Sequence, residues 1–469
     1  MRMLQHMRVM NRRRPKRGGF TLVELMVAVV LLSVVVTVIF ALFSTTSDSM
    51  YEADSLADTV DRARFALERV STDVRGAGSY GTPDAEHDKW VKPKPSQGNS
   101  LPMFGLVLYD GWQDGGDDRI PSDVRDAHGN DNNPPFSFDG IIVIGAFDFP
   151  QSFEVTDLTF DGNEVDQGVI PANERGLYKL MVNDPFYVSV GEPPGFDSAS
   201  DMEHLTEYLP SRVIRVMDRD GYFQFGGVKP NVSDSPTGLT FTLEEPWMVR
   251  DNDGGKVGGG GLEPGSVDDD DIGYDAALLD AYWYYIEPDP RDPVNFRLVR
   301  ERLNARELLN EVGSDGKLDD IDNPGEKFPA MSDDGSESRQ RAVITDRVVD
   351  FQIWFDCADN AGNVEGVEWR DTWVQDDPGD CAEGSNVELG KARTAHLRLS
   401  LRTEHERGDN PDSPNAIFSD DEGDFDPHQP MRYFNMYPDA EGSARVVTVQ
   451  NDVELTTFAM RNVNYRGGQ

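Results

Sequence analysis

A stretch of nineteen residues without a charged side chain, 25–43, most constrains how this chain can fold. As an α-helix, nineteen residues span about 28 Å, close to the thickness of the hydrocarbon core of a bilayer. Glu24 stands at the outer end of this stretch. A charged side chain costs about 2–3 kcal/mol near the bilayer centre and less near the interface, so a carboxylate here points to a function. Basic residues precede the stretch: Arg12, Arg13, Arg14, Lys16 and Arg17.

Two common kinds of segment share this combination of basic start and apolar stretch. A secretory signal peptide has a shorter apolar region followed by small residues at a cleavage site. Here the apolar region is long, and Leu42-Phe43-Ser44 leads directly into a helical pattern. A plain membrane anchor fits the basic start and the length better. It gives no reason for Gly19-Phe20 or for Glu24.

Residues 19–24, Gly-Phe-Thr-Leu-Val-Glu, resemble the class III signal of type IV prepilins and pseudopilins. The resemblance implies that a prepilin peptidase removes residues 1–19 by cutting after Gly19, and that the new N-terminus, Phe20, is N-methylated. It also implies that the carboxylate of Glu24 pairs with the terminal amine of a neighbouring subunit. Such a pair is physically reasonable, because two opposite charges in a low-dielectric setting are each more costly alone than together.

The helical pattern continues beyond the apolar stretch, so we expect one helix over residues 20–76 with its transmembrane part at 25–43. No proline interrupts residues 20–82, and Gly76 and Gly78 are a stop signal. The second half is amphipathic, with apolar residues at three- and four-residue steps: Ala53, Leu56, Ala57, Val60, Ala63, Leu67, Val70 and Val74. The end of this helix, where Asp73-x-Arg75 precedes a glycine-rich turn, is similar to that of PilW-type minor pilins.

The remainder, residues 77–469, is predicted to be a β-rich head with long loops. Residues 79–136 read as loops, and the low-complexity segment 250–275 indicates a linker. The sequence leaves open whether the head is one lobe or two lobes joined near this linker. A short helix is expected at 302–312, and residues 455–462 resemble the closing strand of PilW-type chains. The predicted fold class is therefore α+β and type IV pilin-like, with the long N-terminal helix packed on a large antiparallel sheet. Strands are expected at 138–146, 154–160, 177–182, 186–190, 211–217, 222–225, 238–243, 281–286, 296–300, 348–355, 394–401 and 446–449.

The charge distribution restricts the partners and the location of the chain. A formal net charge of −41 argues against nucleic acid as a partner of the head. The basic leader places the N-terminus in the cytoplasm by the positive-inside rule. We therefore expect a single-pass protein of the inner membrane that reaches the cell surface once it is assembled.

The two cysteines, Cys357 and Cys381, are expected to form a disulfide on the oxidising side of the membrane. The bond would close a loop of about 25 residues, worth about 3 kcal/mol in the chain-entropy model. Two unpaired thiols are the alternative. A zinc site is not expected, because two cysteines without nearby histidines do not make one.

The sequence carries no catalytic or cofactor motif. It has no Gly-x-Ser-x-Gly, no phosphate-binding glycine loop and no His-Glu-x-x-His. No metal ligand set is predicted, although the acidic turns at 218–221, 251–254 and 268–271 leave calcium binding open. None of these turns completes the twelve-residue calcium-binding pattern.

The resemblance implies a minor type IV pilin of the PilW type that helps to prime the pilus or to form its tip. Its partners would be the prepilin peptidase, the inner membrane before assembly, and other major and minor pilins through the N-terminal helix. A type II secretion pseudopilin carries the same signal and is one alternative. A membrane-anchored adhesin is another, since long loops and the aromatic cluster 282–285 suit a binding head.

Overall fold

The structure is a computed structural model in which two compact units, 1–57 and 58–469, are described separately. Helix α1, Leu22–Gly76, contributes residues to both. The described residues are 21–80, 93–94, 99–100, 105–109, 138–160, 163–164, 178–182, 186–191, 207–217, 223–229, 233–235, 238–243, 247–250, 275–311, 324–332, 336–358, 364–365, 392–404, 433–434 and 444–455.

The described part of the first unit is helical, and its apolar side chains face outward. Leu22 to Phe43 carries large hydrophobic residues that are all exposed. Among the described residues, α1 is the one helix long and apolar enough to span a membrane, judged by length and composition. The helical side chains therefore leave a continuous apolar surface that requires a non-aqueous environment or a protein partner.

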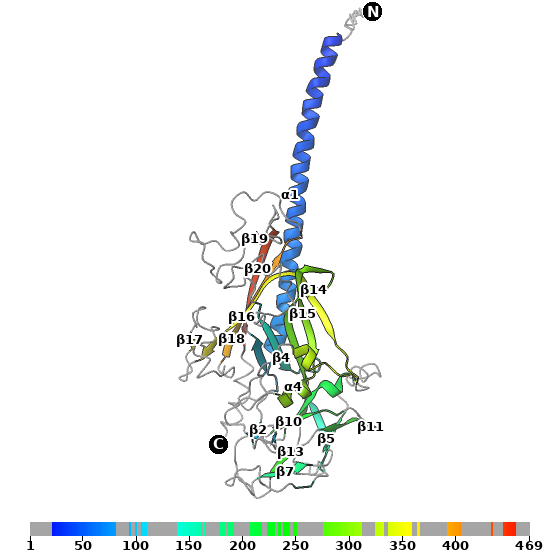
Figure 1. Cartoon of the computed structure of the whole chain (residues 1–469), viewed down its shortest axis with the longest axis vertical. Coiled ribbons are helices and arrows are strands. Elements are labelled where there is room, and N and C mark those ends of the chain that lie inside the picture. Colours follow the sequence, from blue (N-terminus) through cyan, green and yellow to red (C-terminus); the bar gives the residue numbers. More distant parts are fainter. Residues whose placement is uncertain are drawn as a thin grey trace, which may run out of the picture. The chain divides into compact units, whose positions relative to one another are not determined.

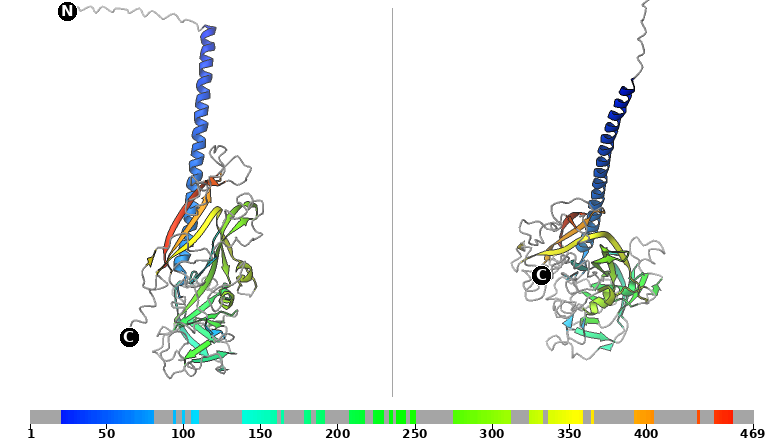
Figure 2. Two further views of the ribbon diagram at one scale, coloured as in Figure 1. Left: turned by 60° about the vertical axis from the view of Figure 1, so that its left-hand side comes forward. Right: turned by 45° about the horizontal axis from the view of Figure 1, so that its top comes forward.

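Within the second unit, the last part of α1 is amphipathic, as its sequence pattern predicts. Its buried side chains recur at three- and four-residue steps and join the largest hydrophobic cluster of the head. Both views in Figure 2 show this part of the helix lying along the strands β16, Arg341–Ala358, β18, Ala392–Arg402, and β20, Ala444–Glu454. The helical residues in the cluster are Ala63, Ala66, Leu67, Val70 and Val74.

The head is built around one large antiparallel sheet, and every strand pair in it is antiparallel. Its main path runs β11-β12-β8-β5-β14-β15-β16-β18-β20-β19 (Figure 1). The other strands on this path are β5, Phe153–Phe160; β8, Phe186–Gly191; β11, Ser233–Ser235; β12, Gly238–Leu243; β14, Asp275–Asp289; β15, Asp292–Leu303; and β19, Tyr433–Phe434.

Additional strands extend this sheet, and two small sheets are separate from it. Attached to the large sheet are β3, Leu106–Tyr109; β4, Gly140–Gly145; β9, Val213–Met217; β10, Phe223–Gly227; and β17, Val364–Glu365. The small sheets consist of β1, Pro93–Lys94, with β2, Asn99–Ser100, and of β13, Trp247–Arg250, with β7, Tyr178–Val182, and β6, Asn163–Glu164. Short helices are η1, Leu209–Ser211; α4, Ala305–Glu311; and α5, Pro324–Lys327.

The fifteen-residue strand β14 pairs with several other strands of the large sheet. Its second half pairs with β15 on one edge and with β4 on the other, and its first half pairs with β9. Alternate side chains enter different hydrophobic clusters, because successive residues of a strand point to opposite faces. Tyr282 and Tyr284 lie in the cluster that contains α1, whereas Trp283 and Tyr285 lie in a cluster on the other face.

Strand β16 changes partners along its length. Its first part, from Arg341 to Val348, pairs with β15, and its second part, from Val348 onward, pairs with β18. The change coincides with Arg347, whose φ of 59° is in the left-handed region that a non-glycine residue rarely adopts. The sheet therefore bends at this point, and the first part of β16 leaves one edge that β18 does not cover.

The predicted α+β fold class is confirmed: a long apolar helix is followed by a large antiparallel sheet region. The interpretation of 79–136 as loops alone is wrong at β3, where a short Leu-Val-Leu-Tyr run pairs with β4. The predicted helix at 302–312 is shorter, because its first residues belong to β15. Nearly all of the proposed linker at 250–275 and all but Leu455 of the closing strand lie outside the described residues.

Candidate functional site

The N-terminus of α1 is closed by a reciprocal pair of contacts between Thr21 and Glu24. The amide nitrogen and Oγ1 of Thr21 donate to Oε2 of Glu24 at 2.9 and 3.0 Å. The amide of Glu24 in turn donates to Oγ1 of Thr21 at 3.3 Å. This arrangement is a capping box, in which two helix donors that would otherwise lack partners are satisfied. The predicted processing residues Gly19 and Phe20 lie outside the described residues.

The capping box leaves half of the Glu24 carboxylate available. Both bonds from Thr21 go to Oε2, and Oε1 accepts no hydrogen bond from the part of the chain that the structure describes. The side chain is exposed, as are its neighbours on α1. A carboxylate near a helix N-terminus is also favoured by the helix dipole. The geometry therefore holds Glu24 in one orientation and leaves an acceptor for a second donor, such as an amine.

A second site fixes the C-terminal end of α1 to the head. Asp73 is buried, and its Oδ2 accepts a 2.6 Å hydrogen bond from the hydroxyl of Tyr284 on β14. The same oxygen accepts a 2.8 Å hydrogen bond from Nε of Arg300 on β15. Arg69, one turn earlier on α1, lies 3.9 Å from Oδ1. Buried charges require such pairing, so Asp73 is stable here only with its partners in place.

The partners of Asp73 are held in position by the sheet itself. Tyr284 and Arg300 are direct cross-strand neighbours in the β14–β15 register. The guanidinium of Arg300 also lies over the ring of Tyr282, 3.3 Å from its centroid. Burial raises the pKa of the Tyr284 phenol, and the carboxylate of Asp73 raises it further. The phenol is therefore protonated throughout the physiological range and donates its hydrogen to Asp73.

Two further contacts join this part of α1 to the strands. Nδ2 of Asn451 on β20 donates to Oγ of Ser71 at 2.7 Å. Arg62 forms an ion pair with Asp346 on β16. With Asp73, these contacts connect one face of the helix to β14, β15, β16 and β20, so the helix is fixed along its length within the head.

The turn after α1 packs against β4 at very short range. The amide of Gly78, which has a φ of 70°, donates to the carbonyl of Ile144 at 2.8 Å. A Cβ added to Gly145 would lie 2.7 Å from the carbonyl oxygen of Gly76. Real Cβ atoms do not approach backbone oxygens so closely, so glycine is required at 145 for the helix end to reach the strand.

A network of alternating charges, in which Arg212, Asp280 and Arg302 are buried, includes the hydroxyl of Tyr282. Nε of Arg212 and Nη1 of Arg302 donate to Oδ1 of Asp280 at 2.8 and 2.6 Å. Nη2 of Arg212 also donates to Oδ2 of Asp148 at 2.7 Å. The hydroxyl of Tyr282 donates to Oδ1 of Asp148 at 3.0 Å. Burial alone would raise the pKa of Asp148, but the guanidinium groups of Arg302 and Arg212 lower it to about 2.

Sequence reasoning identified Asp73 only as part of a helix end and missed its partners. A signal was present in the sequence, because Asp73 follows Val70 by three residues and therefore lies on the face that carries the buried side chains. An acid at a core position of an amphipathic helix requires a buried cation or donor. Tyr284 and Arg300 offer both, but they are more than 200 residues away in the sequence.

The cysteine and calcium predictions are not tested by the structure. Cys357 is on β16, where its backbone pairs with Ala392, but its side chain and all of Cys381 lie outside the described residues. The acidic turns at 218–221, 251–254 and 268–271 also lie outside them. Within the described ranges, no three His, Cys, Asp or Glu side chains are grouped so that they could hold a metal ion.

Comparison with known proteins agrees with the N-terminal geometry. Residues 14–40 match the family model described as the prokaryotic N-terminal methylation motif. The pilin-like protein PilA3 of Thermus thermophilus is 33% identical over 96 residues, which cover 20% of this chain. The chain spans 41% of the length of that relative. No solved structure matches the chain. The chain thus carries a prokaryotic N-terminal methylation motif and is similar over part of its length to a pilin-like protein.

Proposed function

We propose that this pilin-like chain is a minor type IV pilin of the PilW type, which primes the pilus or forms its tip. In this proposal a prepilin peptidase cuts after Gly19 and Phe20 becomes the methylated N-terminus. Helix α1 then leaves the inner membrane and packs among the helices of other pilins. The head, residues 77–469, is displayed at the cell surface. The role is structural and not enzymatic.

The proposal rests on the combination of a methylation motif and an exposed apolar segment at the start of α1. The methylation motif at 14–40 overlaps a helical segment whose apolar side chains are exposed from Leu22 to Phe43. A soluble protein rarely exposes so large an apolar surface without a partner. A membrane before assembly and a bundle of similar helices after it would both cover that surface.

The capping box supports a specific function for Glu24 in assembly. An acid at the edge of a membrane segment is costly, and the two bonds from Thr21 reduce that cost before assembly. The remaining acceptor, Oε1, is suited to the terminal amine of a neighbouring subunit. This amine would exist only after cleavage at Gly19, so processing and assembly would be coupled.

The deciding experiment is to determine the N-terminus of the mature protein by mass spectrometry. We expect it to begin at Phe20 with one added methyl group in wild-type cells, and to retain residues 1–19 in cells without prepilin peptidase. A native chain that retains its first nineteen residues would exclude the proposal. Recovery of the protein in sheared surface filaments would separate a pilus subunit from a type II secretion pseudopilin, which carries the same signal.

A further inference from the structure

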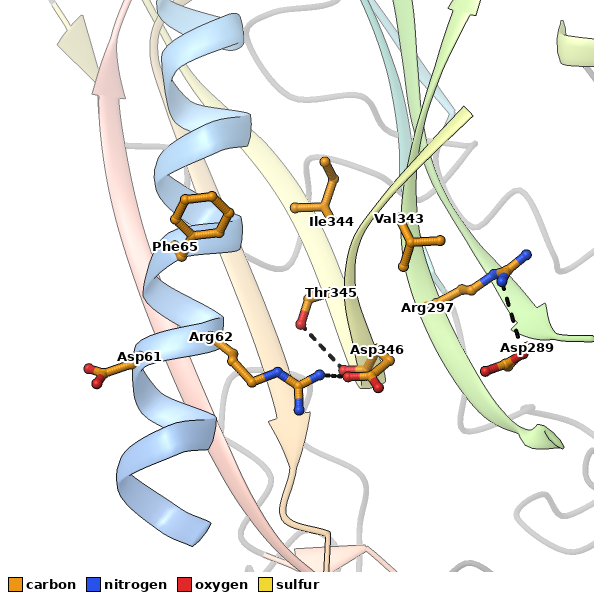
Figure 3. A pocket seen from close by; sticks show the side chains of 9 residues that line it. All are labelled: Asp61, Arg62, Phe65, Asp289, Arg297, Val343, Ile344, Thr345 and Asp346. Carbon is orange, nitrogen blue, oxygen red and sulfur yellow. Dashed lines mark hydrogen bonds and ion pairs between the residues drawn. The ribbon is translucent and has the colours of Figure 1, made fainter. Parts of the chain in front are cut away.

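An open hollow of about 510 Å³ lies between α1 and the first part of β16. Figure 3 shows Phe65 on the helix side, and Val343 and Ile344 on the strand side, with Arg62 and Asp346 below them. All of these residues belong to the second unit. The hollow is therefore a feature of the head itself.

The hollow exists because β16 changes partners. Residues 341–347 pair with β15 on one edge, and β18 begins to pair with β16 only at Val348. No described strand pairs with the other edge of 341–347. An uncovered strand edge presents backbone donors and acceptors that another extended segment can bind.

The hollow is also where the head exposes large hydrophobic side chains. Among the described residues of the second unit, Phe65 and Val343 are the only large hydrophobic ones that are exposed, at 68% and 52%. Both line the same hollow. Exposed apolar side chains that converge on a strand edge are typical of a protein interaction site.

The charges of the hollow favour a basic partner. The two arginines in its lining are already neutralised, since Arg62 pairs with Asp346 and Arg297 pairs with Glu287 outside the hollow. The lining holds three acids, Asp61, Asp289 and Asp346, against these two arginines, and Asp289 lies 3.9 Å from Arg297. The lining thus retains an acidic excess beside its apolar residues.

We propose that this hollow binds an extended segment of a neighbouring pilin-type subunit, which adds a strand to the uncovered edge of β16. An apolar side chain of that segment lies between Phe65 and Val343, and an adjacent Lys or Arg interacts with the acidic excess of the lining. This inference rests on the proposed function, because it requires a neighbouring subunit in a filament. It adds to that function a docking surface on the head and the chemistry of what docks there.

The partner segment can be identified by photo-crosslinking in assembled filaments. A Val343→p-benzoylphenylalanine variant is irradiated, and the joined peptides are sequenced by mass spectrometry. The control carries the same substitution at Glu326, an exposed residue of α5 outside the hollow. We expect position 343, and not position 326, to be joined to a segment of another subunit that contains apolar and basic residues. Joining to the same chain, to lipid or to an acidic segment would overturn the inference.

Substitutions test whether the surface matters for assembly. Val343→Glu and Phe65→Glu place an acid at the centre of the hollow, and Val343→Thr keeps the shape of the side chain. We expect the two acidic variants to be recovered about tenfold less in sheared filaments, and Val343→Thr and Glu326→Lys to match the wild type. Equal recovery of all four variants in sheared filaments would overturn the inference.

Two controls separate this inference from the function on which it rests. Val343 and Phe65 are exposed, so their variants should keep the thermal unfolding temperature and the mature N-terminus of the wild type. If the wild type itself is not cut before Phe20 or is absent from filaments, the proposed function fails. If the wild type is cut and assembled but the acidic variants assemble equally well, only the docking surface fails.

Discussion

The hydroxyl of Tyr284 donates a 2.6 Å hydrogen bond to the carboxylate of Asp73, joining strand β14 to the end of helix α1. Arg300 binds the same carboxylate oxygen from the next strand. Asp73, which is more than 200 residues from both partners in the sequence, thus forms one polar contact with a strand hairpin. Removal of Asp73 takes the shared acceptor away from both Tyr284 and Arg300.

Replacing Asp73 should therefore destabilise the head more than replacing another acid on the same helix. Asp73→Ala leaves Arg300, whose side chain is 13% exposed, without its counter-ion, and the loss of one partner of a buried pair costs about 3–5 kcal/mol. Asp61→Ala is the control, since its carboxylate is exposed. Urea unfolding of the detergent-solubilised full chain, followed by near-ultraviolet circular dichroism, measures both. Similar midpoints for the two variants would show that Asp73 does not anchor the helix.

Gly145→Ala should also destabilise the head, for a steric reason. The added methyl would lie 2.7 Å from the carbonyl oxygen of Gly76, so the helix end and β4 must move apart. Overpacking of this kind costs about 1–3 kcal/mol. Gly191→Ala is the matched control, because its new methyl finds its nearest neighbour at 3.5 Å. Thermal unfolding should therefore separate the two alanine variants, and an equal effect at both positions would contradict the close approach.

The network around Asp148 predicts a defined acid sensitivity. Burial opposes ionisation of Asp148, but Arg302 and Arg212 prevail and lower its pKa to about 2 in the folded state. In the unfolded chain an aspartate has a pKa of about 3.9. The carboxylate therefore stabilises the fold fully above about pH 4. This contribution is lost as the pH falls from about 4 toward 2.

An Asp148→Asn variant tests this relationship. The amide does not titrate, so the free energy of unfolding should fall less steeply between pH 4 and pH 2 in the variant than in the wild type. Glu326→Gln, at an exposed position, controls for the general loss of acidic charge. Urea unfolding at several pH values gives the two slopes. Parallel curves for wild type and Asp148→Asn would exclude a lowered pKa.

Substitutions at Glu24 separate its two contacts. Glutamine keeps an oxygen that accepts hydrogen bonds from Thr21, and it serves in capping boxes, but it carries no charge. Alanine removes both the cap and the charge. If pairing with a neighbour's amine drives assembly, Glu24→Gln and Glu24→Ala should both be depleted from sheared filaments while each still inserts into the membrane. Normal recovery of Glu24→Gln would instead assign the function of Glu24 to capping.

The long helix and the strands could be predicted from the sequence because their signals are local. The glycines at 76 and 78 mark the end of α1, and the apolar steps through Val70 and Val74 mark its buried face. Alternation in Leu397, Leu399 and Leu401 predicts a strand with one apolar face, and all three side chains are in the core. The alternation also predicts that the other face is solvated, which is wrong, because Arg398, Ser400 and Arg402 are buried as well. Apolar residues recur every 3.6 residues in a helix and every 2 residues in a strand whenever one face of the element is buried, whatever packs against that face.

The contacts of Asp73 and the hollow beside Val343 could not be predicted in the same way, because they depend on pairing between distant segments. Nothing near Asp73 specifies that Tyr284 and Arg300 will be cross-strand neighbours beneath it. The hollow beside Val343 arises where β16 leaves one partner for another at Arg347, and only strand register determines that position. The β3 strand was missed because its four residues are surrounded by loop-forming glycine, proline and aspartate.

The length of β14 affects how the head unfolds. Ala276 and Leu278 belong to one hydrophobic cluster, Tyr284 to a second, and Trp283 and Tyr285 to a third. A protease that cleaved this strand would disrupt all three clusters in a single event. The described core of residues 58–469 should accordingly melt in one cooperative transition, with no stable fragment in which a single cluster survives alone.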